Sequence, residues 1–349
     1  MKKLLSIVVF SVCLGLSFSG CCGGASGKSA ADKNPKTALS LWNDDAPAKK
    51  ALSEYVKTVT DKNSPDFIPV ENRIAIFDMD GTLCCETHPT YFDFQMFVHR
   101  VLEDKSFTPN TEQLFIAENF RDTGYVPPLS AEYERILASA YKNMTVEELG
   151  NYIRDFMETP QPGYKNLKRK DAFYKPMVQV VKYLTANDFT VYVSSGSDRF
   201  IVRGLAGQAL NLPPHQLIGS DSLVVSSNQE DKDGLDYTFK DGDRLVMGGK
   251  NLVKNLQMNK VVTIIREIGV QPVLGFGNSL TDASMVNYAM YGNKYKSLGF
   301  MLCCDDTDRE YGNPQKAEKM LASCKENGWI PVSMKNDWKT IYGDDVEKE

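Results

Sequence analysis

The sequence predicts an α/β fold in which short buried strands alternate with amphipathic helices. Residues 74–77, 189–193 and 272–276 are short apolar runs rich in strand-forming residues. Between these runs lie segments with apolar residues at helical spacing, such as residues 177–184 and 260–269. Alternation of this kind is typical of α/β domains. At 349 residues and 42% hydrophobic, the chain can bury a large core, most simply as one main domain with an insertion.

The N-terminus has the pattern of an export signal. Two lysines directly after Met1 precede an apolar run, residues 4–18, that is too short for a comfortable membrane span. The run leads into the sequence S-F-S-G-C, which ends at Cys21. This sequence resembles the lipoprotein box of bacteria, in which the cysteine is acylated and becomes the mature N-terminus, although Phe18 stands where leucine is usual. Acylation of Cys21 and ordinary cleavage just before it are the two alternatives.

The following residues are expected to form a link to a folded domain. Residues 1–20 are predicted to be a signal peptide, and residues 21–40, which are mostly small and polar, a flexible tether. The predicted location is periplasmic, or membrane-anchored as a lipoprotein, in a bacterium. If Cys21 is acylated, the membrane is a partner through that lipid, and more than one acyl chain is needed for stable attachment. The eight cysteines show no zinc-site spacing, and their disulfide pairing stays open.

A long helical segment interrupts the strand pattern after the first strand. Its stretches of helical register are residues 91–102, 111–120, 130–141 and 145–157. Thr145 and Glu148 fit a capping box at the start of the last stretch. We therefore expect a helical domain at residues 87–174, inserted into an α/β core made of residues 41–86 and 175–349.

The second half of the chain is expected to complete the sheet. Residues 217–226 and 236–247 have strand patterning, with a turn at Asp241-Gly242 that favours a hairpin. Residues 297–302 are a plausible last core strand, and the tail beyond them is expected to dock on the core.

Two acids directly follow the first strand. Residues 73–83 read R-I-A-I-F-D-M-D-G-T-L, and side chains two apart on a strand face the same way, so Asp78 and Asp80 can project into one pocket. Close carboxylates repel each other, which raises the pKa of one of them. One acid can then act as a charged nucleophile while the other carries a proton for a leaving group. Gly81 and Thr82 follow where the backbone can curl round a phosphate and offer N–H groups to it.

Further polar residues follow the later strands. The strand at residues 189–193 runs into S-S-G-S-D, where a hydroxyl at a strand end can donate to a phosphate oxygen. A serine-rich turn that caps a helix is the alternative. Ser195 fits the phosphate-binding role best, Ser194 is the alternative, and Gly196 is a further candidate substrate contact. Lys260 opens an amphipathic helix, where an isolated lysine would ordinarily be solvated.

In this order, the motifs resemble those of the haloacid dehalogenase (HAD) superfamily of hydrolases. D-M-D-G-T-L at residues 78–83 resembles the first motif, Ser195 the second, Lys260 the third, and G-N-S-L-T-D at residues 277–282 the fourth. The fourth motif usually reads G-D-x-x-x-D, so Asn278 replaces an acid; its amide oxygen can still ligate a hard cation, with one negative charge fewer. The resemblance is closest to the phosphoserine-phosphatase-like branch, whose type 1 cap matches the helical insertion.

The resemblance implies a doubly wound, Rossmann-like parallel sheet with the site at the carboxyl ends of its strands. It also implies a Mg²⁺-dependent phosphomonoester hydrolase that works through a phosphoaspartyl intermediate. In that mechanism Asp78 attacks phosphorus, Asp80 protonates the leaving alkoxide and then activates water, and Ser195 and Lys260 hold phosphate oxygens. The implied magnesium ligands, direct or through water, are Asp78, the Asp80 carbonyl, Asn278 and Asp282.

The expected partner is a small phosphorylated metabolite: phosphoserine, phosphocholine, phosphoethanolamine or a mixture of scavenged esters. Glu86, at the base of the cap, resembles a substrate-sensing residue in relatives, and a hinge-surface glutamate is the alternative. A formal net charge of −5 gives no positive face for nucleic acid, which is not expected as a partner. The alternative function, motivated by Asn278, is a catalytically weakened protein that only binds phospho-ligands.

Overall fold

The computed structural model describes residues 39–349. The predicted signal peptide, the acylation of Cys21 and nearly all of the predicted tether lie outside the described residues. No helix in the described range combines the length and the apolar character that a membrane crossing requires.

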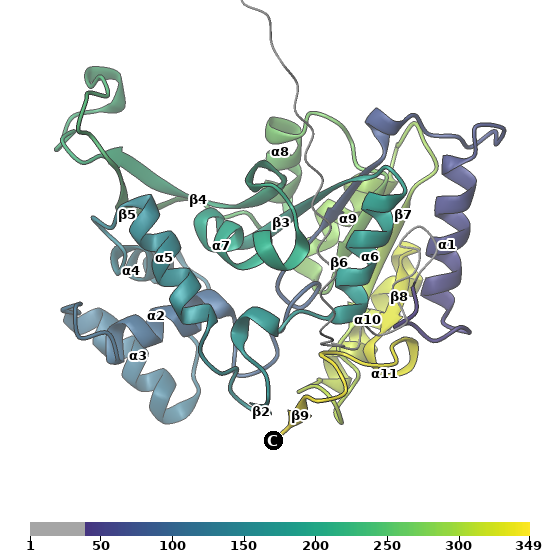
Figure 1. Cartoon of the computed structure of the whole chain (residues 1–349), viewed down its shortest axis with the longest axis horizontal. Helices are drawn as coiled ribbons and strands as arrows, with labels where there is room; N and C mark the ends of the chain where they lie inside the picture. The colour runs from purple at the N-terminus through teal and green to yellow at the C-terminus, as the bar shows by residue number, and fades with distance from the viewer. Residues whose placement is uncertain (1–38) are drawn as a thin grey trace, which may run out of the picture.

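A seven-stranded sheet runs through the centre of the molecule, in the order β5-β4-β3-β1-β6-β7-β8 (Figure 1). The strands are β1 (Ile74–Phe77), β3 (Thr190–Asp198), β4 (Leu217–Ser226), β5 (Leu245–Val253), β6 (Leu274–Gly277), β7 (Leu298–Cys303) and β8 (Ile330–Ser333). Every neighbouring pair is parallel except β4–β5. From β1 the chain fills one side of the sheet and then the other, so β1 lies where the strand order reverses. The predicted doubly wound α/β fold is confirmed.

Helices cover both faces of this sheet. Successive residues of β1 face opposite ways, so its side chains pack against both helical layers. They are α1 (Pro47–Thr60), α6 (Lys175–Ala186), α7 (Arg199–Leu210), α8 (Met258–Glu267), α9 (Ala283–Met290) and α10 (Pro314–Asn327). Ile76 is buried in the cluster formed with residues of α8, α9 and α10. Ala75 and Phe77 belong to the other cluster, with residues of α1 and α6. The Phe77 ring stacks on Phe276 at 4.1 Å between centroids, which ties β1 to β6 below the site.

The four helices that follow β1 in the chain, before α6, form a separate lobe to one side of the sheet (Figure 1). They are α2 (Phe92–Leu102), α3 (Thr111–Thr123), α4 (Ala131–Ser139) and α5 (Val146–Met157). We call this lobe the cap. The predicted capping box of α5 is present, since Glu148 N donates to Thr145 Oγ1 at 3.0 Å and Thr145 N donates to Glu148 Oε2 at 2.7 Å.

The β4–β5 hairpin differs from its prediction. The second strand begins at Leu245 and not at Asp236. The physical reason is Asp243, whose Oδ2 accepts hydrogen bonds from Lys240 N and from the Tyr237 hydroxyl, both at 2.8 Å. These bonds fold the segment into a polar loop and take its backbone away from the ladder.

The hairpin reaches from the sheet to the cap (Figure 1). Asn143 N donates to Met247 O, and Met247 N donates to Met144 O, both at 2.8 Å. Strand β5, which lies outside residues 87–174, therefore packs beside the end of α4 and contacts the cap. The proposed domain boundaries themselves stay a prediction.

Both connections between core and cap meet at a buried carboxylate, Glu310, which is 0% exposed. Glu310 accepts hydrogen bonds from Thr87 Oγ1 at 2.6 Å and from Tyr311 N at 2.8 Å. It also accepts from the hydroxyls of Tyr164 and Tyr342. Thr87 belongs to the outgoing connection, Tyr164 to the returning one, and Tyr342 to the carboxyl-terminal segment. One side chain therefore joins three separate parts of the chain.

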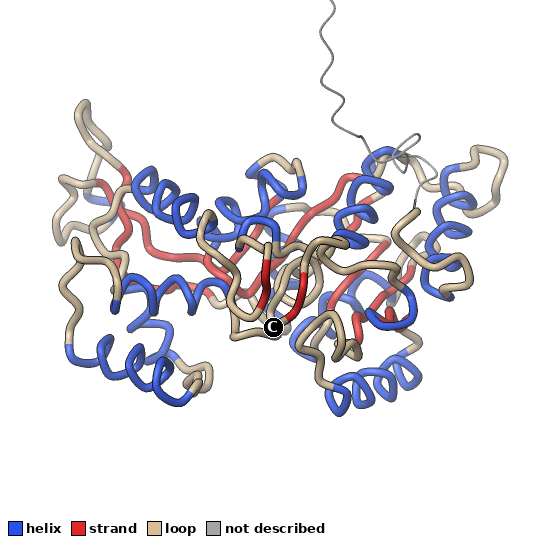
Figure 2. The backbone as a smooth tube through the Cα atoms, turned by 60° about the horizontal axis from the view of Figure 1, so that its bottom comes forward, coloured by secondary structure: helices blue, strands red, loops and turns tan. Residues whose placement is uncertain are grey.

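The same place holds a two-stranded ladder. Strand β2 (Tyr164–Lys165) pairs antiparallel with β9 (Glu347–Lys348), next to the labelled C-terminus in Figure 2. The Tyr311 hydroxyl lies 3.0 Å from Gly163 O and 2.9 Å from Glu349 O. A short helix, α11 (Met334–Asp337), precedes this carboxyl-terminal segment. Trp329, Val332 and Trp338 are buried in the core, which confirms that the tail docks on it.

The cysteines of the described residues are free and buried. They are Cys84, Cys85, Cys303, Cys304 and Cys324. Burial raises the pKa of the Cys85 thiol to about 12, so the thiol stays neutral at ordinary pH.

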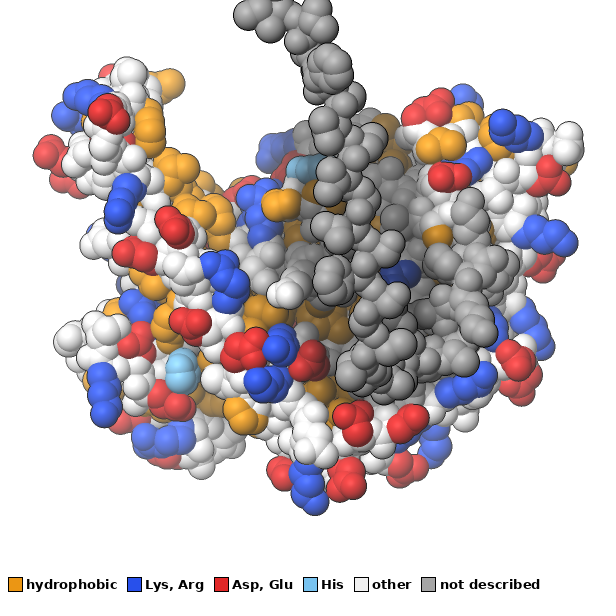
Figure 3. Space-filling model, viewed as in Figure 1, with side chains coloured by type: hydrophobic (Ala, Val, Ile, Leu, Met, Phe, Trp, Pro, Cys, Tyr) orange, Lys and Arg blue, Asp and Glu red, His pale blue; other side chains and the backbone are white. Residues whose placement is uncertain are grey.

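Charged side chains of both signs are interspersed on the face that Figure 3 shows. Within the described residues visible there, Lys and Arg side chains do not gather into one large patch. The arrangement agrees with the formal net charge of −5.

Candidate active site

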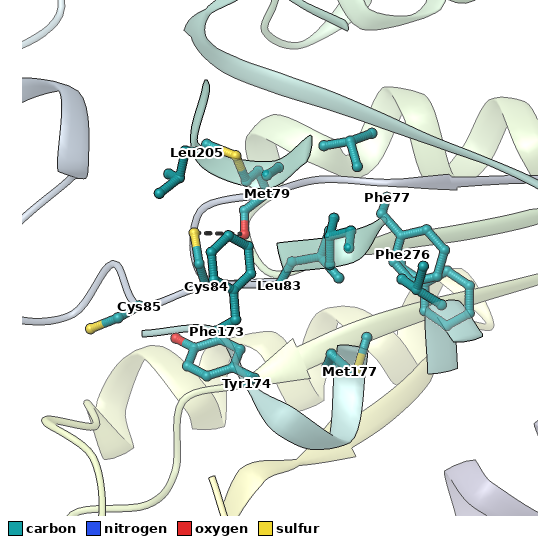
Figure 4. Packing of buried hydrophobic residues seen from close by; sticks show 14 of the residues in the cluster. Phe77, Met79, Leu83, Cys84, Cys85, Phe173, Tyr174, Met177, Leu205 and Phe276 are labelled. Carbon is teal, nitrogen blue, oxygen red and sulfur yellow. Dashed lines mark hydrogen bonds between the residues drawn. The ribbon is translucent and has the colours of Figure 1, made fainter. Parts of the chain in front are cut away.

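The two acids of the first motif lie at the carboxyl end of β1. Asp78 N donates to Phe276 O at 2.9 Å and so extends the pairing of β1 with β6. Met79 follows, and its side chain points into the apolar core beside Leu83 (Figure 4). Because neighbouring residues on a strand alternate, Asp78 and Asp80 both face the opposite side, toward the cap.

A buried lysine holds the first of these acids. Lys260 Nζ, on the first turn of α8, lies 2.6 Å from Asp78 Oδ1 and 2.8 Å from Asp282 Oδ1. Lys260 is 0% exposed, so the alternative of a solvated lysine does not hold. Burial alone would lower the pKa of Lys260, but the charges of Asp282 and Asp78 outweigh burial and raise its pKa. Lys260 therefore stays charged beside Asp78.

The second acid has a different environment. Asp80 Oδ2 accepts hydrogen bonds from Ser195 Oγ at 3.1 Å and from Ser197 Oγ at 3.0 Å. Burial, and then the negative charges of Asp93 and Glu86, raise the pKa of Asp80 to about 7, against the opposing hydrogen bonds of the two serines. Asp80 can therefore carry a proton near neutral pH, as a general acid must. Burial and the charge of Asp282 raise the pKa of Asp78 as well, but Asp78 differs from Asp80 in its contact with the ammonium group of Lys260, which opposes that shift.

The alternation of β3 separates its three serines. Ser195 and Ser197 face Asp80, while Ser194 Oγ accepts from Asn255 Nδ2 at 3.0 Å on the other side. Of the two serines considered from the sequence, Ser195 is the one beside the acids. Ser197 was missed because the strand was expected to end at residue 193, whereas it continues to residue 198. Period-two spacing from Ser195 is the signal that would have found it.

The fourth motif wraps round the lysine and the first acid. Asp282 Oδ2 accepts from the backbone N–H groups of Asn278 and Ser279, both at 3.1 Å. Thr82 Oγ1 lies 3.3 Å from Asp78 Oδ2 and 3.3 Å from Asn278 Oδ1. The oxygens of Asp78 and Asn278 are therefore neighbours, bridged by one hydroxyl.

The backbone N–H groups of Gly81 and Thr82, predicted to face a phosphate, both have partners within the described residues, and their contact with a phosphate stays a prediction. Gly81 N donates to Cys84 O at 2.8 Å, and Thr82 N donates to Met79 O at 3.1 Å. These bonds close the tight turn after β1 and use both donors. The turn also positions the Thr82 hydroxyl next to the Asp78 carboxylate, with Thr82 Oγ1 3.3 Å from Asp78 Oδ2.

Gly81 is required by space as well as by conformation. Its φ is +78°, and an added Cβ would lie 2.0 Å from Asn278 Nδ2 and 2.7 Å from Glu86 Cδ. Gly81→Ala is expected to lower the free energy of unfolding by about 1–2 kcal/mol through the left-handed backbone. It should also displace Asn278 and lower kcat/KM by about 10²-fold, as small misplacements at a reacting centre do. Thermal unfolding and phosphate-release kinetics measure the two effects.

Gly124 offers a matched control for this substitution. Its φ is +70°, and an added Cβ would meet nothing within 4 Å. Gly124→Ala should show the same loss of stability with unchanged kinetics. Equal activity in the two variants would contradict the expectation that a side chain at position 81 displaces Asn278 and so lowers activity.

The acids open into a cavity of about 270 Å³ between core and cap. Asp78, Asp80 and Gly196 line its core side, and Glu86 lies at its edge. Glu86, predicted to contact substrate, forms an ion pair with Lys316 at 2.6 Å. Five predicted site residues thus line one cavity: Asp78, Asp80, Glu86, Gly196 and Asn278. Ser195 and Lys260 do not line it but contact the two acids, and Asp282 contacts Lys260. The roles of all these residues stay predictions.

Fold and site together define an α/β enzyme centred on paired aspartates at a strand end. The sequence profile of the haloacid dehalogenase-like hydrolase family matches residues 75–287. The chain belongs to this family, and the prediction of the superfamily and of a hydrolytic enzyme is confirmed. Among curated proteins no match was found.

Several solved structures have a similar fold. A conserved protein of unknown function from Anaerococcus prevotii DSM 20548 is 13% identical, with 81% of this chain and 92% of that chain covered and a TM-score of 0.49. Cytosolic 5'-nucleotidase IIIB bound to cytidine is 12% identical, with 84% and 88% covered and a TM-score of 0.47. A phosphoaspartyl intermediate analogue of phosphoserine phosphatase is 15% identical, with 75% and 93% covered and a TM-score of 0.37. These likenesses concern the fold alone.

Proposed function

We propose that the protein is a phosphatase that hydrolyses small phosphomonoesters through a phosphoaspartyl intermediate on Asp78. The observation that supports this most is the different surroundings of the two acids. Asp78 lies 2.6 Å from a buried ammonium group, while Asp80 lies between two hydroxyls with its pKa raised to about 7. One acid is thus suited to attack as an anion and the other to deliver a proton.

The proposed reaction has two steps. A carboxylate oxygen of Asp78 attacks phosphorus, the bond to the ester oxygen breaks, and Asp80 gives its proton to the departing alkoxide. Asp80 then takes a proton from water, whose oxygen attacks phosphorus, and the bond to Asp78 breaks to release inorganic phosphate. Lys260 offsets the negative charge where carboxylate and phosphate meet, and Ser195 donates to a phosphate oxygen. The cap excludes bulk water from the aspartyl phosphate.

The residues present fit a magnesium ion beside Asp78. The neighbouring oxygens of Asp78 and Asn278 are hard donors of the kind that Mg²⁺ prefers, and the Asp80 carbonyl would be a third. Both oxygens of Asp282 are already hydrogen-bonded, one to Lys260 and one to backbone N–H groups, so Asp282 would reach the ion through water. No cluster of three or more His, Cys, Asp or Glu suited to a metal occurs in the described range. When bound, the ion would offset the charge of carboxylate and phosphate.

Asn278→Asp is expected to strengthen magnesium binding, because it adds a negative charge next to Asp78. The concentration of Mg²⁺ that gives half of the maximal activity should fall about tenfold, since ligand charge tunes affinity for hard cations. A thermal-shift titration with Mg²⁺ should show the same displacement without any substrate. An unchanged titration in both measurements would contradict the placement of the ion beside Asn278.

One assay separates this proposal from the alternative, in which Asn278 marks a protein that binds phospho-ligands without turnover. The purified chain is incubated with 4-nitrophenyl phosphate, with and without a chelator. Release of phosphate that the chelator abolishes and Mg²⁺ restores supports the phosphatase. Binding of the ester with no release of phosphate supports the alternative.

We also propose that the enzyme acts outside the cytoplasm. The support is the pattern of residues 1–21, with a basic start, an apolar run and a cysteine at the expected cleavage site. Fractionation of cells that express the whole chain, with a Cys21→Ala variant, would show whether the protein is exported and whether the cysteine holds it at the membrane.

A further inference from the structure

We propose that the leaving alcohol of the substrate carries an ammonium group and that Asp93 of the cap recognises this charge. The inference rests on the proposed phosphatase function and narrows it to phosphate esters of amino alcohols.

Asp93 has a free carboxylate oxygen at the cavity. It lies on the first turn of α2, is partly buried, and lines the same cavity as Asp78 and Asp80. Its Oδ1 accepts a hydrogen bond from Phe94 N at 2.7 Å, on its own helix. None of the ion pairs found among residues 39–349 includes Asp93. Its charge therefore has no cationic partner within the described protein.

The neighbouring carboxylates are already compensated. Glu86 pairs with Lys316 at 2.6 Å, and Glu134 pairs with Lys254 at 2.8 Å. Among the described acids on the cap side of the cavity, Asp93 is thus the one whose charge is not balanced by an ion pair. Burial raises the pKa of both Asp80 and Tyr133, and the charge of Asp93 adds to both shifts, so Asp93 lies close enough to act on both groups.

The walls around Asp93 suit a compact organic cation. Tyr91 and Tyr133 line this part of the cavity, and aromatic rings attract ammonium groups. Val126 and Pro127, from the loop between α3 and α4, add apolar surface. A cavity of about 270 Å³ accepts a small alkylammonium chain. The pocket thus combines one free negative charge with aromatic and aliphatic walls.

A leaving group with its own carboxylate fits less well. Lys254 is the lysine among the described residues that line the cavity, and it is paired with Glu134. A carboxylate such as that of phosphoserine would find no free cation there and would lie near Asp93. Phosphate esters of ethanolamine or choline type are therefore favoured over phosphoserine.

Two substrates of equal shape test the inference: choline phosphate and 3,3-dimethylbutyl phosphate, which differ by a charged nitrogen in place of a neutral carbon. The whole chain should hydrolyse choline phosphate with a kcat/KM roughly 10- to 100-fold higher, as expected for one charge recognised in a partly desolvated site. Asp93→Asn should remove this preference, so that kcat/KM for the two esters becomes equal within about twofold, because Asn keeps the shape and the bond to Phe94. The ratio of the two esters is the readout, since any effect of the lost charge on the pKa of Asp80 acts on both esters alike.

Glu103→Gln is the matched control, since Glu103 lies at the other end of α2 with an exposed side chain. This variant loses one charge and should keep the preference. Equal turnover of both esters by the unaltered chain would overturn the role of Asp93 while the phosphatase stands. If Asp93→Asn lowers kcat/KM for both esters by the same factor and keeps the preference, the proposed recognition role of Asp93 is overturned too, because such a result indicates a structural role. If neither ester releases phosphate from the folded chain, the proposed function fails and the inference fails with it.

Discussion

Replacing Asp78 with asparagine is expected to lower phosphate release by about 10⁴-fold or more, since removal of a nucleophile leaves only binding and electrostatic effects. Asparagine has nearly the shape of aspartate but cannot form a phosphoaspartyl bond. Lys260 would keep its ion pair with Asp282 at 2.8 Å, so the buried ammonium group is not left alone. The variant should therefore fold. Phosphate release in reactions quenched at set times measures the loss of activity. Trapping of the phosphorylated protein shows whether the intermediate forms.

A surface variant controls for a general effect of losing a carboxylate. Asp66 pairs with Lys296 on the surface and does not line the cavity, so Asp66→Asn should keep full activity. Circular dichroism and thermal unfolding of Asp78→Asn check that the fold survives. Full activity in a folded Asp78→Asn protein would refute the phosphoaspartyl mechanism.

Replacing Asp80 with asparagine is expected to slow hydrolysis of an alkyl phosphate by about 10²–10⁴-fold, the range for loss of a general acid and base. With 4-nitrophenyl phosphate the first step should slow much less, because nitrophenolate leaves without a proton. An asparagine oxygen can still accept from Ser195 and Ser197, so the local hydrogen bonds are conserved. The measurement is the burst of nitrophenol against the steady rate, together with kcat for ethyl phosphate.

The contrast between the two leaving groups is the diagnostic result. Asp80 also activates water in the second step, so the aryl ester should give a rapid burst of nitrophenol followed by slow turnover. Ser197→Ala is the companion variant: it removes one hydroxyl within 3.0 Å of Asp80 and should show a weaker form of the same contrast. An equal slowing of the first step for both esters would rule out Asp80 as the proton donor.

Local patterns predicted most of the elements because the signals for them are local. The cap helices follow from apolar periodicity, and the capping box of α5 fixes its start at the expected residue. The prediction that residues 297–302 form the last core strand was wrong, because β8 pairs beyond β7 and completes the sheet. Two strand boundaries were also missed for tertiary reasons. Strand β3 continues through S-S-G-S-D, which has the composition of a turn, because pairing with β4 resumes at Asp198 after an irregularity in the register. Strand β5 starts late because Asp243 ties the preceding residues into a loop.

The site was only partly predictable because several of its residues lie far apart in the sequence and come together only in the folded chain. Spacing within the first motif placed Asp78 and Asp80 together, since that relation depends on one strand. Lys260 is 182 positions from Asp78, and only the resemblance to a family suggested that they meet. Asp93 lies in a helix whose sequence shows an apolar face and nothing else of note. Its proposed role depends on which other carboxylates have partners, and that can be known only from the folded chain.

The meeting of both core–cap connections at Glu310, next to the β2–β9 ladder, bears on how the cavity could open. Strand β9 pairs with β2, and β2 belongs to the returning connection of the cap. A rotation of the cap that moved β2 with it would have to break this short ladder or carry residues 347–349 along. In that case a change that loosened the carboxyl-terminal segment would also make the cavity easier to open.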